Sequence, residues 1–298
     1  MFKVKVPATS ANMGPGFDCI GIALDLYNEV EVYESDKPLH FIWECEEEEV
    51  PEKENFIYTS MMDVFKEHDF PIPNVKVIAR KCNIPMVRGL GSSSAAIVAG
   101  LTLAYALMGK DFDKDLLAYK AWVIEGHPDN VVPCFLGGMT ISVMDEGRPY
   151  TTHVPIEDRV KFMAVIPPYK TETKQSREVL PKDYTRADCI QNVSRASMMI
   201  NAFNLKDYHL LRTAFGDRIH QPYRLPLLKD AAYVFELFKE NGAIGEFMSG
   251  SGSTLMGVFL DDCQDRKLVI EEKLKAIDPL FRVELLNVDR TGVVLSKI

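Results

Sequence analysis

Residues 85–96 read Pro85-Met-Val-Arg-Gly-Leu-Gly-Ser-Ser-Ser-Ala-Ala96, and this stretch decides the fold. It joins residues 75–80, whose alternating pattern predicts a strand, to residues 92–108, which we predict to form a long apolar helix. Gly89 and Gly91 let the backbone turn tightly and come close to a ligand. The first amides of a helix lack internal partners and the helix dipole is positive there, so this turn predicts a polyphosphate site.

An ordinary glycine turn with a serine cap also fits these residues. Three familiar motifs do not match: the chain has no GxxxxGK[ST] and no GxSxG, and residues 89–94 lack the third glycine of the dinucleotide fingerprint.

The composition is that of an ordinary globular protein, with 298 residues, 47% of them hydrophobic and 26% charged. A net charge of -9 argues against a nucleic-acid partner, which requires a basic face. The longest apolar stretch, residues 95–108, is short for a bilayer span, so we expect no membrane partner. The acidic run at residues 44–49, interrupted by Cys45, predicts a solvated loop or strand end.

The cysteines are far apart and include no CxxC pair, so we expect neither a metal cluster nor a disulfide framework. They are Cys19, Cys45, Cys82, Cys134, Cys189 and Cys263. A reducing compartment fits this pattern best, and the first residues contain no long apolar core of a signal peptide. We therefore expect a cytoplasmic location.

Hydrophobic periodicity predicts an α+β chain with mainly antiparallel sheet. The expected strands are residues 4–6, 27–33, 41–43, 75–80, 138–144, 160–166, 246–249, 255–260, 282–286 and 293–295. The expected helices are residues 55–68, 92–108, 113–124, a short one within 126–138, 188–203, 208–215, 227–239 and 264–275. The polar segment 145–155 suggests a domain boundary, which divides the chain into residues 1–152 and 153–298.

Three further polar clusters carry candidate chemistry. Residues 7–18, PATSANMGPGFD, leave Asn12 and Asp18 available as ligand groups, although an Asx turn would also fit. Residues 125–130, EGHPDN, combine a carboxylate for magnesium at Glu125 with Asp129 as a base or an orienting group. A structural histidine is the alternative for His127. Residues 248–254, MSGSGST, predict either a loop whose backbone amides contact a phosphate or a plain hairpin turn.

The four clusters, in this order, resemble the GHMP kinase family over nearly the whole chain. Two more segments, TKQSREVLP at 173–181 and DRIHQPYR at 217–224, are similar to arginine-bearing segments of the family members that phosphorylate L-homoserine. The resemblance implies a domain like ribosomal protein S5 domain 2, then a ferredoxin-like domain, with the site between them. It also implies ATP as co-substrate, Mg²⁺ as metal and the side-chain hydroxyl of L-homoserine as phosphoryl acceptor.

The resemblance assigns roles residue by residue. The ATP-binding residues would be Asn55, Pro85, Met86, Val87, Arg88, Gly89, Leu90, Gly91, Ser92, Ser93, Ser94 and Ala95. The magnesium ligands would be Ser93 and Glu125. The amino and hydroxyl end of the acceptor would meet Asn12, Asp18, His127 and Asn130, and its carboxylate would meet Arg177 and Arg224. A guanidinium fork matches a carboxylate geometrically, which supports the last pair independently.

The catalytic roles fall on Glu125 through the metal, on Asn130 as an orienting group and on Asp129 as a minor candidate for a base. Two positions depart from the family pattern. Ser253 stands where a proline is usual in the last motif, and Val123 stands where many relatives carry an acidic residue.

Two other functions remain open. Another family kinase, for mevalonate or a related compound, would also need a carboxylate clamp, but the two arginine segments with Asn12 and Asp18 favour an α-amino acid. A non-catalytic nucleotide sensor is disfavoured by the intact Ser93, Glu125 and His127. The sequence leaves the oligomeric state open, a homodimer included.

Overall fold

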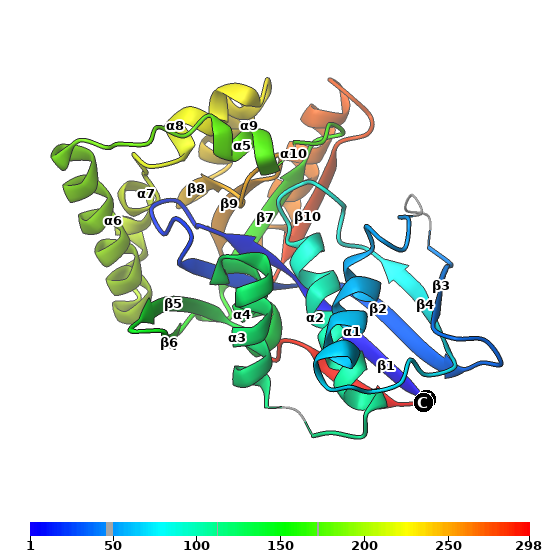
Figure 1. The fold of residues 1–298 in the computed structure, drawn as a ribbon. Helices are drawn as coiled ribbons and strands as arrows, with labels where there is room; N and C mark the ends of the chain where they lie inside the picture. The colour runs from blue at the N-terminus through cyan, green and yellow to red at the C-terminus, as the bar shows by residue number, and fades with distance from the viewer. Residues whose placement is uncertain (46–49, 112, 172) are drawn as a thin grey trace.

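The computed structural model of the protein describes residues 1–45, 50–111, 113–171 and 173–298. It contains two β-sheets with helices packed against them (Figure 1). The acidic run lies largely outside the described residues, at 46–49, so the predicted solvated loop there stays a prediction. None of the helices in the described ranges is long and apolar enough to cross a membrane.

The first sheet has seven strands and contains both the first and the last strand of the chain. Its main order is β11-β1-β2-β4-β3, and β5 pairs with β2 and with β6. The strands are β1 (Phe2–Ala11), β2 (Ile20–Glu34), β3 (His40–Trp43), β4 (Val75–Cys82), β5 (Met139–Asp145), β6 (Arg148–Val154) and β11 (Val294–Lys297). All pairs are antiparallel except β3 with β4. The long β2 joins the two halves of the sheet, since it pairs with β5 at residues 20–22 and with β4 at residues 28–34.

Four helices accompany this sheet: α1 (Phe56–Glu67), α2 (Ser92–Leu107), α3 (Lys114–Glu125) and α4 (Pro128–Leu136). Helix α2 is apolar on nearly every side and lies buried among β1, α1, α3 and α4. The first turn of α2 is therefore fixed by a rigid core.

The second sheet has four antiparallel strands in the order β10-β7-β9-β8. They are β7 (Val160–Ile166), β8 (Gly245–Met248), β9 (Leu255–Leu260) and β10 (Arg282–Leu286). The helical segments are α5 (Thr173–Glu178), α6 (Arg186–Leu205), η1 (Tyr208–Leu210), α7 (Leu211–Ala214), α8 (Gln221–Arg224), η2 (Leu225–Leu227), α9 (Ala231–Glu240) and α10 (Gln264–Lys275). Side chains alternate along β7, so that Phe162 packs into the core shared with the first sheet and Met163 into a second core under α9 and α10. The expected α+β architecture with mainly antiparallel sheet is confirmed.

Segment 145–155, in which we placed the domain boundary, contains a strand that the sequence did not predict. Strand β6 forms a hairpin with β5, and all of its residues except Val154 are exposed. A strand exposed on both faces has no hydrophobic alternation, which explains why it was missed. The division at 152/153 stays a prediction, and β11 returns to the first sheet beside β1.

The sequence predicts no disulfide framework, yet the structure contains one disulfide. Cys45 and Cys82 form a disulfide, with their Cα atoms 5.8 Å apart. They are 37 residues apart in sequence but lie at the ends of the neighbouring strands β3 and β4, a proximity that spacing alone does not reveal. The other four cysteines are free.

Candidate active site

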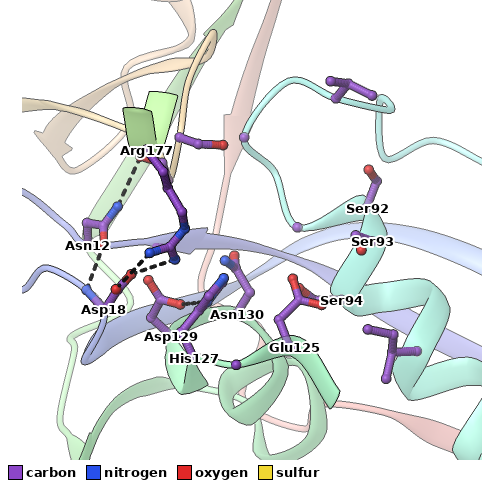
Figure 2. A pocket seen from close by; sticks show the side chains of 18 of the residues that line it. Asn12, Asp18, Ser92, Ser93, Ser94, Glu125, His127, Asp129, Asn130 and Arg177 are labelled. Atoms are coloured by element: carbon purple, nitrogen blue, oxygen red, sulfur yellow. Dashed lines mark hydrogen bonds and ion pairs between the residues drawn. The ribbon is translucent and has the colours of Figure 1, made fainter. Parts of the chain in front are cut away.

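The EGHPDN cluster forms the junction between two helices. Helix α3 ends at Glu125, Gly126 leaves the helix at φ 88°, and His127 is the N-cap of α4. Asp129 and Asn130 then lie in the first turn of α4. This tight junction brings the polar side chains of the cluster to one cavity (Figure 2).

The serine-rich turn begins α2 as predicted. Gly91 is the N-cap with φ 70°, and no side chain caps the first turn. The first hydrogen bond of the helix runs from Ala95 N to Gly91 O at 2.8 Å, so the amides of Ser92, Ser93 and Ser94 lack helical partners. These amides and hydroxyls lie at the cavity, which is the arrangement expected of a phosphate site.

The fourth cluster packs directly under this turn. Ser249 Oγ donates to Gly89 O at 2.6 Å, and Thr254 N donates to Arg88 O at 3.0 Å. A Cβ at Gly89 would lie 2.4 Å from the carbonyl oxygens of Ser249 and Gly252, so no larger residue fits there. The loop after β8 thus holds the serine-rich turn, which is the predicted phosphate turn, in place.

The first cluster begins within β1, which ends at Ala11, and continues as a loop. The backbone of this loop is unusual at three non-glycine residues, Asn12 with φ 70°, Met13 with φ 44° and Asp18 with φ 54°. Asn12 Oδ1 accepts from Asp18 N and Asn12 Nδ2 donates to Gly250 O, both at 3.0 Å (Figure 2). The amide of Asn12 is therefore engaged within the protein, where it ties the first cluster to the fourth. A contact between Asn12 and substrate stays a prediction.

One cavity of about 710 Å³ gathers residues from all four clusters and from both arginine segments. The predicted site residues that line it are Asn12, Asp18, Val87, Arg88, Gly89, Gly91, Ser92, Ser93, Ser94, Glu125, His127, Asp129, Asn130, Arg177 and Arg224. Five predicted residues do not line it. Leu90 is fully buried, Pro85 lines a separate groove, and a second cavity contains Asn55, Met86 and Ala95.

A second, mostly apolar cavity of about 570 Å³ shares Val87, Ser92 and Ser93 with the first and also contains Asn55, Met86 and Ala95. Asn55 Oδ1 caps α1 by accepting from the amides of Ile57 and Tyr58. Its Nδ2 is buried and has no partner among the described residues. A buried donor without a partner is able to bind a ligand acceptor, and an apolar cavity beside the predicted phosphate site suits a nucleotide base.

The two arginines that line the cavity differ in their exposure to solvent and in their hydrogen-bond partners. Arg177 is half exposed and forms a two-point salt bridge with Asp18, at 3.1 and 3.2 Å. Arg224 is 2% exposed, donates to the backbone carbonyls of Ser176 and Gly250, and lies over the ring of Phe17, 5.2 Å from its centroid. Among the described residues no carboxylate lies within salt-bridge distance of Arg224. Burial, together with the charge of Arg177, lowers the pKa of Arg224 to about 10, so its charge persists at neutral pH.

The carboxylates and the histidine of the EGHPDN cluster are coupled. His127 Nδ1 lies 2.6 Å from Asp129 Oδ1. Burial acts to lower the pKa of His127, but the hydrogen bond and charge of Asp129 outweigh it and raise this pKa above its ordinary value. Burial also raises the pKa of Glu125, partly offset by the charge of His127 and by the hydrogen bond that Ser94 Oγ donates to Glu125 Oε1 at 3.1 Å. The half-buried carboxylate of Glu125 beside serine hydroxyls is a donor set that fits Mg²⁺.

Sequence reasoning missed several residues that line the main cavity. Phe56, Ile97, Ile124 and Thr171 carry no chemistry that distinguishes them from core or surface residues. Phe56 directly follows Asn55, which is the one local signal for it. The sequence indicated cluster 248–254, but it did not predict Gly250 and Ser251 of that cluster as site residues.

Comparison with known protein families identifies the class of protein to which the chain belongs. The model of the GHMP kinases N terminal domain matches residues 55–138, and the model of the GHMP kinases C terminal domain matches residues 199–275. The first match contains the phosphate turn and the EGHPDN junction. GHMP kinases are thus the class that the fold and the site define.

Similar proteins of the same length show which group of GHMP kinases the chain resembles. A homoserine kinase of Clostridium novyi is 41% identical over 297 residues, covering 100% of this chain and 99% of the relative. A homoserine kinase of Clostridium kluyveri is 40% identical over 296 residues, covering 99% of each chain. The crystal structure of homoserine kinase from Cytophaga hutchinsonii superposes with a TM-score of 0.86 at 24% identity, covering 99% of this chain and 97% of the other, which shows the common fold. The chain belongs to the homoserine kinases of the GHMP kinase family, and the two-domain fold expected from the sequence is confirmed.

Proposed function

We propose that the protein transfers the γ-phosphoryl group of ATP to the side-chain hydroxyl of L-homoserine and so forms O-phospho-L-homoserine for threonine biosynthesis. The observation that carries the proposal is the guanidinium of Arg224, which is buried in the same cavity as the serine-rich turn and Arg177 and has no salt-bridge partner among the described residues. A buried cation without a carboxylate partner favours an anionic ligand. The proposal is supported further by relatives named homoserine kinase over the full length of the chain.

In this proposal the amino acid lies between the arginines and α4. Arg177 and Arg224 bind its carboxylate, and Asp18 binds its ammonium group. Asp18, His127 and Asp129 offer ligand atoms within 4.8 Å of one another, a negatively charged corner that suits a cation. These contacts orient the side-chain hydroxyl toward α2.

ATP fits the other half of the cavity. Its phosphates meet the amides and hydroxyls at the start of α2, and its base enters the apolar cavity beside Asn55. Ser93 and Glu125 would hold Mg²⁺, with Ser94 bound to Glu125 as a neighbour. When bound, the ion neutralises charge on the phosphate oxygens.

Catalysis in such a site consists mainly of positioning and electrostatic stabilisation, because phosphoryl transfer needs little covalent chemistry from a protein. The helix amides stabilise charge on the transferred group, and Asn130 orients the reacting hydroxyl. Asp129 is engaged with His127, which makes it an orienting residue for that ring and only a minor candidate for a base.

A coupled ADP-release assay tests the proposal, with L-homoserine, L-threonine, L-serine, D-homoserine and mevalonate as separate acceptors. We expect the highest kcat/KM for L-homoserine. D-homoserine is the matched control, because a fixed carboxylate and ammonium group would misplace its hydroxyl. Turnover with mevalonate and not with L-homoserine would favour another family kinase, and ATP binding without turnover for any acceptor would favour a sensor.

We also propose that the protein is cytoplasmic and that it has no nucleic-acid or membrane partner. Gel filtration will test whether it forms a homodimer. The acidic net charge of -9 supports the lack of a nucleic-acid partner. The redox state of Cys45 and Cys82 in cells tests the proposed location, because disulfides are rare in reducing compartments. Acid quenching of cells and alkylation should find both thiols reduced if the protein is cytoplasmic.

A further inference from the structure

Thr9 is a fully buried residue of β1 that contacts both halves of the active site. Its Oγ1 donates to Asn130 Oδ1 at 2.8 Å, and its backbone N donates to Leu90 O at 3.2 Å. The first contact reaches the first turn of α4, which in the proposed function lies beside the bound L-homoserine. The second reaches the phosphate turn. A single residue of the rigid sheet therefore touches both.

The hydroxyl of Thr9 also fills the space under Gly91. A Cβ built on Gly91 would lie 2.0 Å from Thr9 Oγ1 and 3.2 Å from Asn130 Oδ1. The N-cap of α2, the hydroxyl and the amide of Asn130 are thus in mutual contact.

Thr9 Oγ1 donates to Asn130 Oδ1, and this hydrogen bond places the oxygen end of the Asn130 amide against β1. With Oδ1 engaged as an acceptor, Nδ2 has no partner among the described residues, and Asn130 lines the main cavity (Figure 2). The amide nitrogen is only a donor. It can bind an oxygen of the acceptor or of the transferred group, and it cannot remove a proton.

We propose that Thr9 is a positioning residue for phosphoryl transfer, which acts by fixing the amide of Asn130 with its donor toward the reacting oxygens. This inference rests on the proposed function. It goes beyond that function because it assigns to the buried hydroxyl, and not only to the residues that line the cavity, control over the transition-state geometry.

The change Thr9→Val keeps the shape of the side chain and removes its hydroxyl. We expect kcat to fall about 10- to 100-fold, because a misplacement of about 1 Å costs on the order of 10²-fold in rate. The KM values for ATP and L-homoserine should stay within about twofold, the scale of independent sites, because the helix amides and the arginines make the ground-state contacts. Thr9→Ser retains the donor and should restore most of kcat.

A double-mutant cycle between Thr9→Val and Asn130→Ala is the decisive experiment. If Thr9 acts through Asn130, adding Thr9→Val to Asn130→Ala should change kcat by less than about twofold. Thr102→Val is the matched control, since Thr102 is also fully buried and its hydroxyl donates to Val98 O inside α2. It should lower the melting temperature and leave kcat unchanged. If Thr9→Val does not fold, Thr9→Ala takes its place in the cycle.

Two results would overturn the role of Thr9: an undiminished loss from Thr9→Val in the Asn130→Ala background, or a raised KM for ATP with unchanged kcat, which would mean that Thr9 only supports the phosphate turn. Wild-type protein that does not phosphorylate L-homoserine would instead refute the proposed function. An active wild type with additive losses would refute the role of Thr9 alone.

Discussion

Arg177 and Asp18 bind each other through two hydrogen bonds across the active-site cavity, from Nη1 to Oδ2 at 3.2 Å and from Nη2 to Oδ1 at 3.1 Å. Asp18 comes from the loop between β1 and β2, and Arg177 comes from α5 beside the second sheet. Both side chains are about one third or more exposed, so the pair contributes little to stability. The opposite charges of this pair match those of an amino acid. When an amino acid binds, its carboxylate would take the place of Asp18 beside Arg177, and its ammonium group would take the place of Arg177 beside Asp18.

The change Asp18→Asn should weaken binding of L-homoserine by removing the partner of its ammonium group. We expect the KM for L-homoserine to rise about 10- to 100-fold, as for loss of a charged hydrogen bond, with little change in the KM for ATP. Initial-rate kinetics with each substrate varied in turn will measure this. Glu178→Gln is the control, because Glu178 is an exposed acid of α5 that lies outside the cavity. Equal increases in both KM values would contradict the assignment.

The change Arg224→Lys keeps the charge but loses the planar fork that binds a carboxylate. We expect the KM for L-homoserine to rise by about 10-fold or more, from the loss of a charged hydrogen bond, while nucleotide affinity is retained. Titration with a fluorescent ATP analogue separates the two effects. Arg212→Lys is a suitable comparison, because Arg212 also donates to a backbone carbonyl, that of Ala243, but does not line the cavity. Weakened binding of both substrates would mean that Arg224 chiefly supports the structure.

The change Asp129→Asn should leave most of the turnover, because Asp129 is bound to His127 and we expect the reaction to need no general base. Single-turnover rates with saturating ATP and L-homoserine will test this without interference from product release. A fall of about 10³-fold or more, within the range of a lost base, would reverse the view.

Acidification should destabilise the protein through His220. This residue is fully buried, stacks on Phe17 with ring centroids 5.4 Å apart and donates from Nε2 to Gly14 O at 2.8 Å. Burial lowers its pKa below the ordinary 6.5, although the charge of Asp217 opposes part of the shift. The unfolded chain therefore binds more protons than the folded one just below pH 6.5, so the free energy of unfolding decreases as pH falls through this window.

Urea unfolding of wild type and His220→Asn at pH 7.5 and 5.5 will measure the effect. Wild type should lose more stability between the two pH values than the variant does. The comparison cancels the contribution of every other titrating group. The same pH dependence in both proteins would show that His220 does not contribute.

Reduction of the Cys45–Cys82 disulfide should destabilise the protein. The bond closes a loop across 37 positions of the sequence. The chain-entropy estimate for a loop of this length is about 4 kcal/mol as an upper value. Thermal unfolding with and without a dithiol reductant measures the change, and Cys45→Ser should lose the response. Six titratable thiols in the unreduced, denatured protein would show that the bond does not form.

Sequence patterns predicted the second half of the fold well. Strands at residues 160–166 and 255–260 and the helix at 264–275 have the bounds that were expected, because continuous or periodic apolar residues identify them. The exposed β6 could not be predicted in this way, and neither could the parallel pairing of β3 with β4, which depends on contacts distant in sequence.

The site was predictable where it depends on residue type. Polar clusters that interrupt apolar runs indicated Glu125, Asn130 and the serines, and the structure brings them to one cavity. Thr9 belongs to the first of these clusters, but its role depends on a contact 121 positions away along the chain, which only the folded structure reveals. Phe56 and Thr171 have no distinguishing chemistry, so their place in the cavity could not be foreseen either.

The pairing of β11 with β1 has a consequence for how the protein is made. Lys297 lies opposite Phe2 in the register of these two strands, so β11, the partner of β1, leaves the ribosome after all the other strands of the first sheet. At about 5–20 residues per second, translation leaves that edge of β1 uncovered for tens of seconds. An uncovered strand edge can pair with another chain. Nascent copies should therefore depend on chaperones most strongly before β11 emerges.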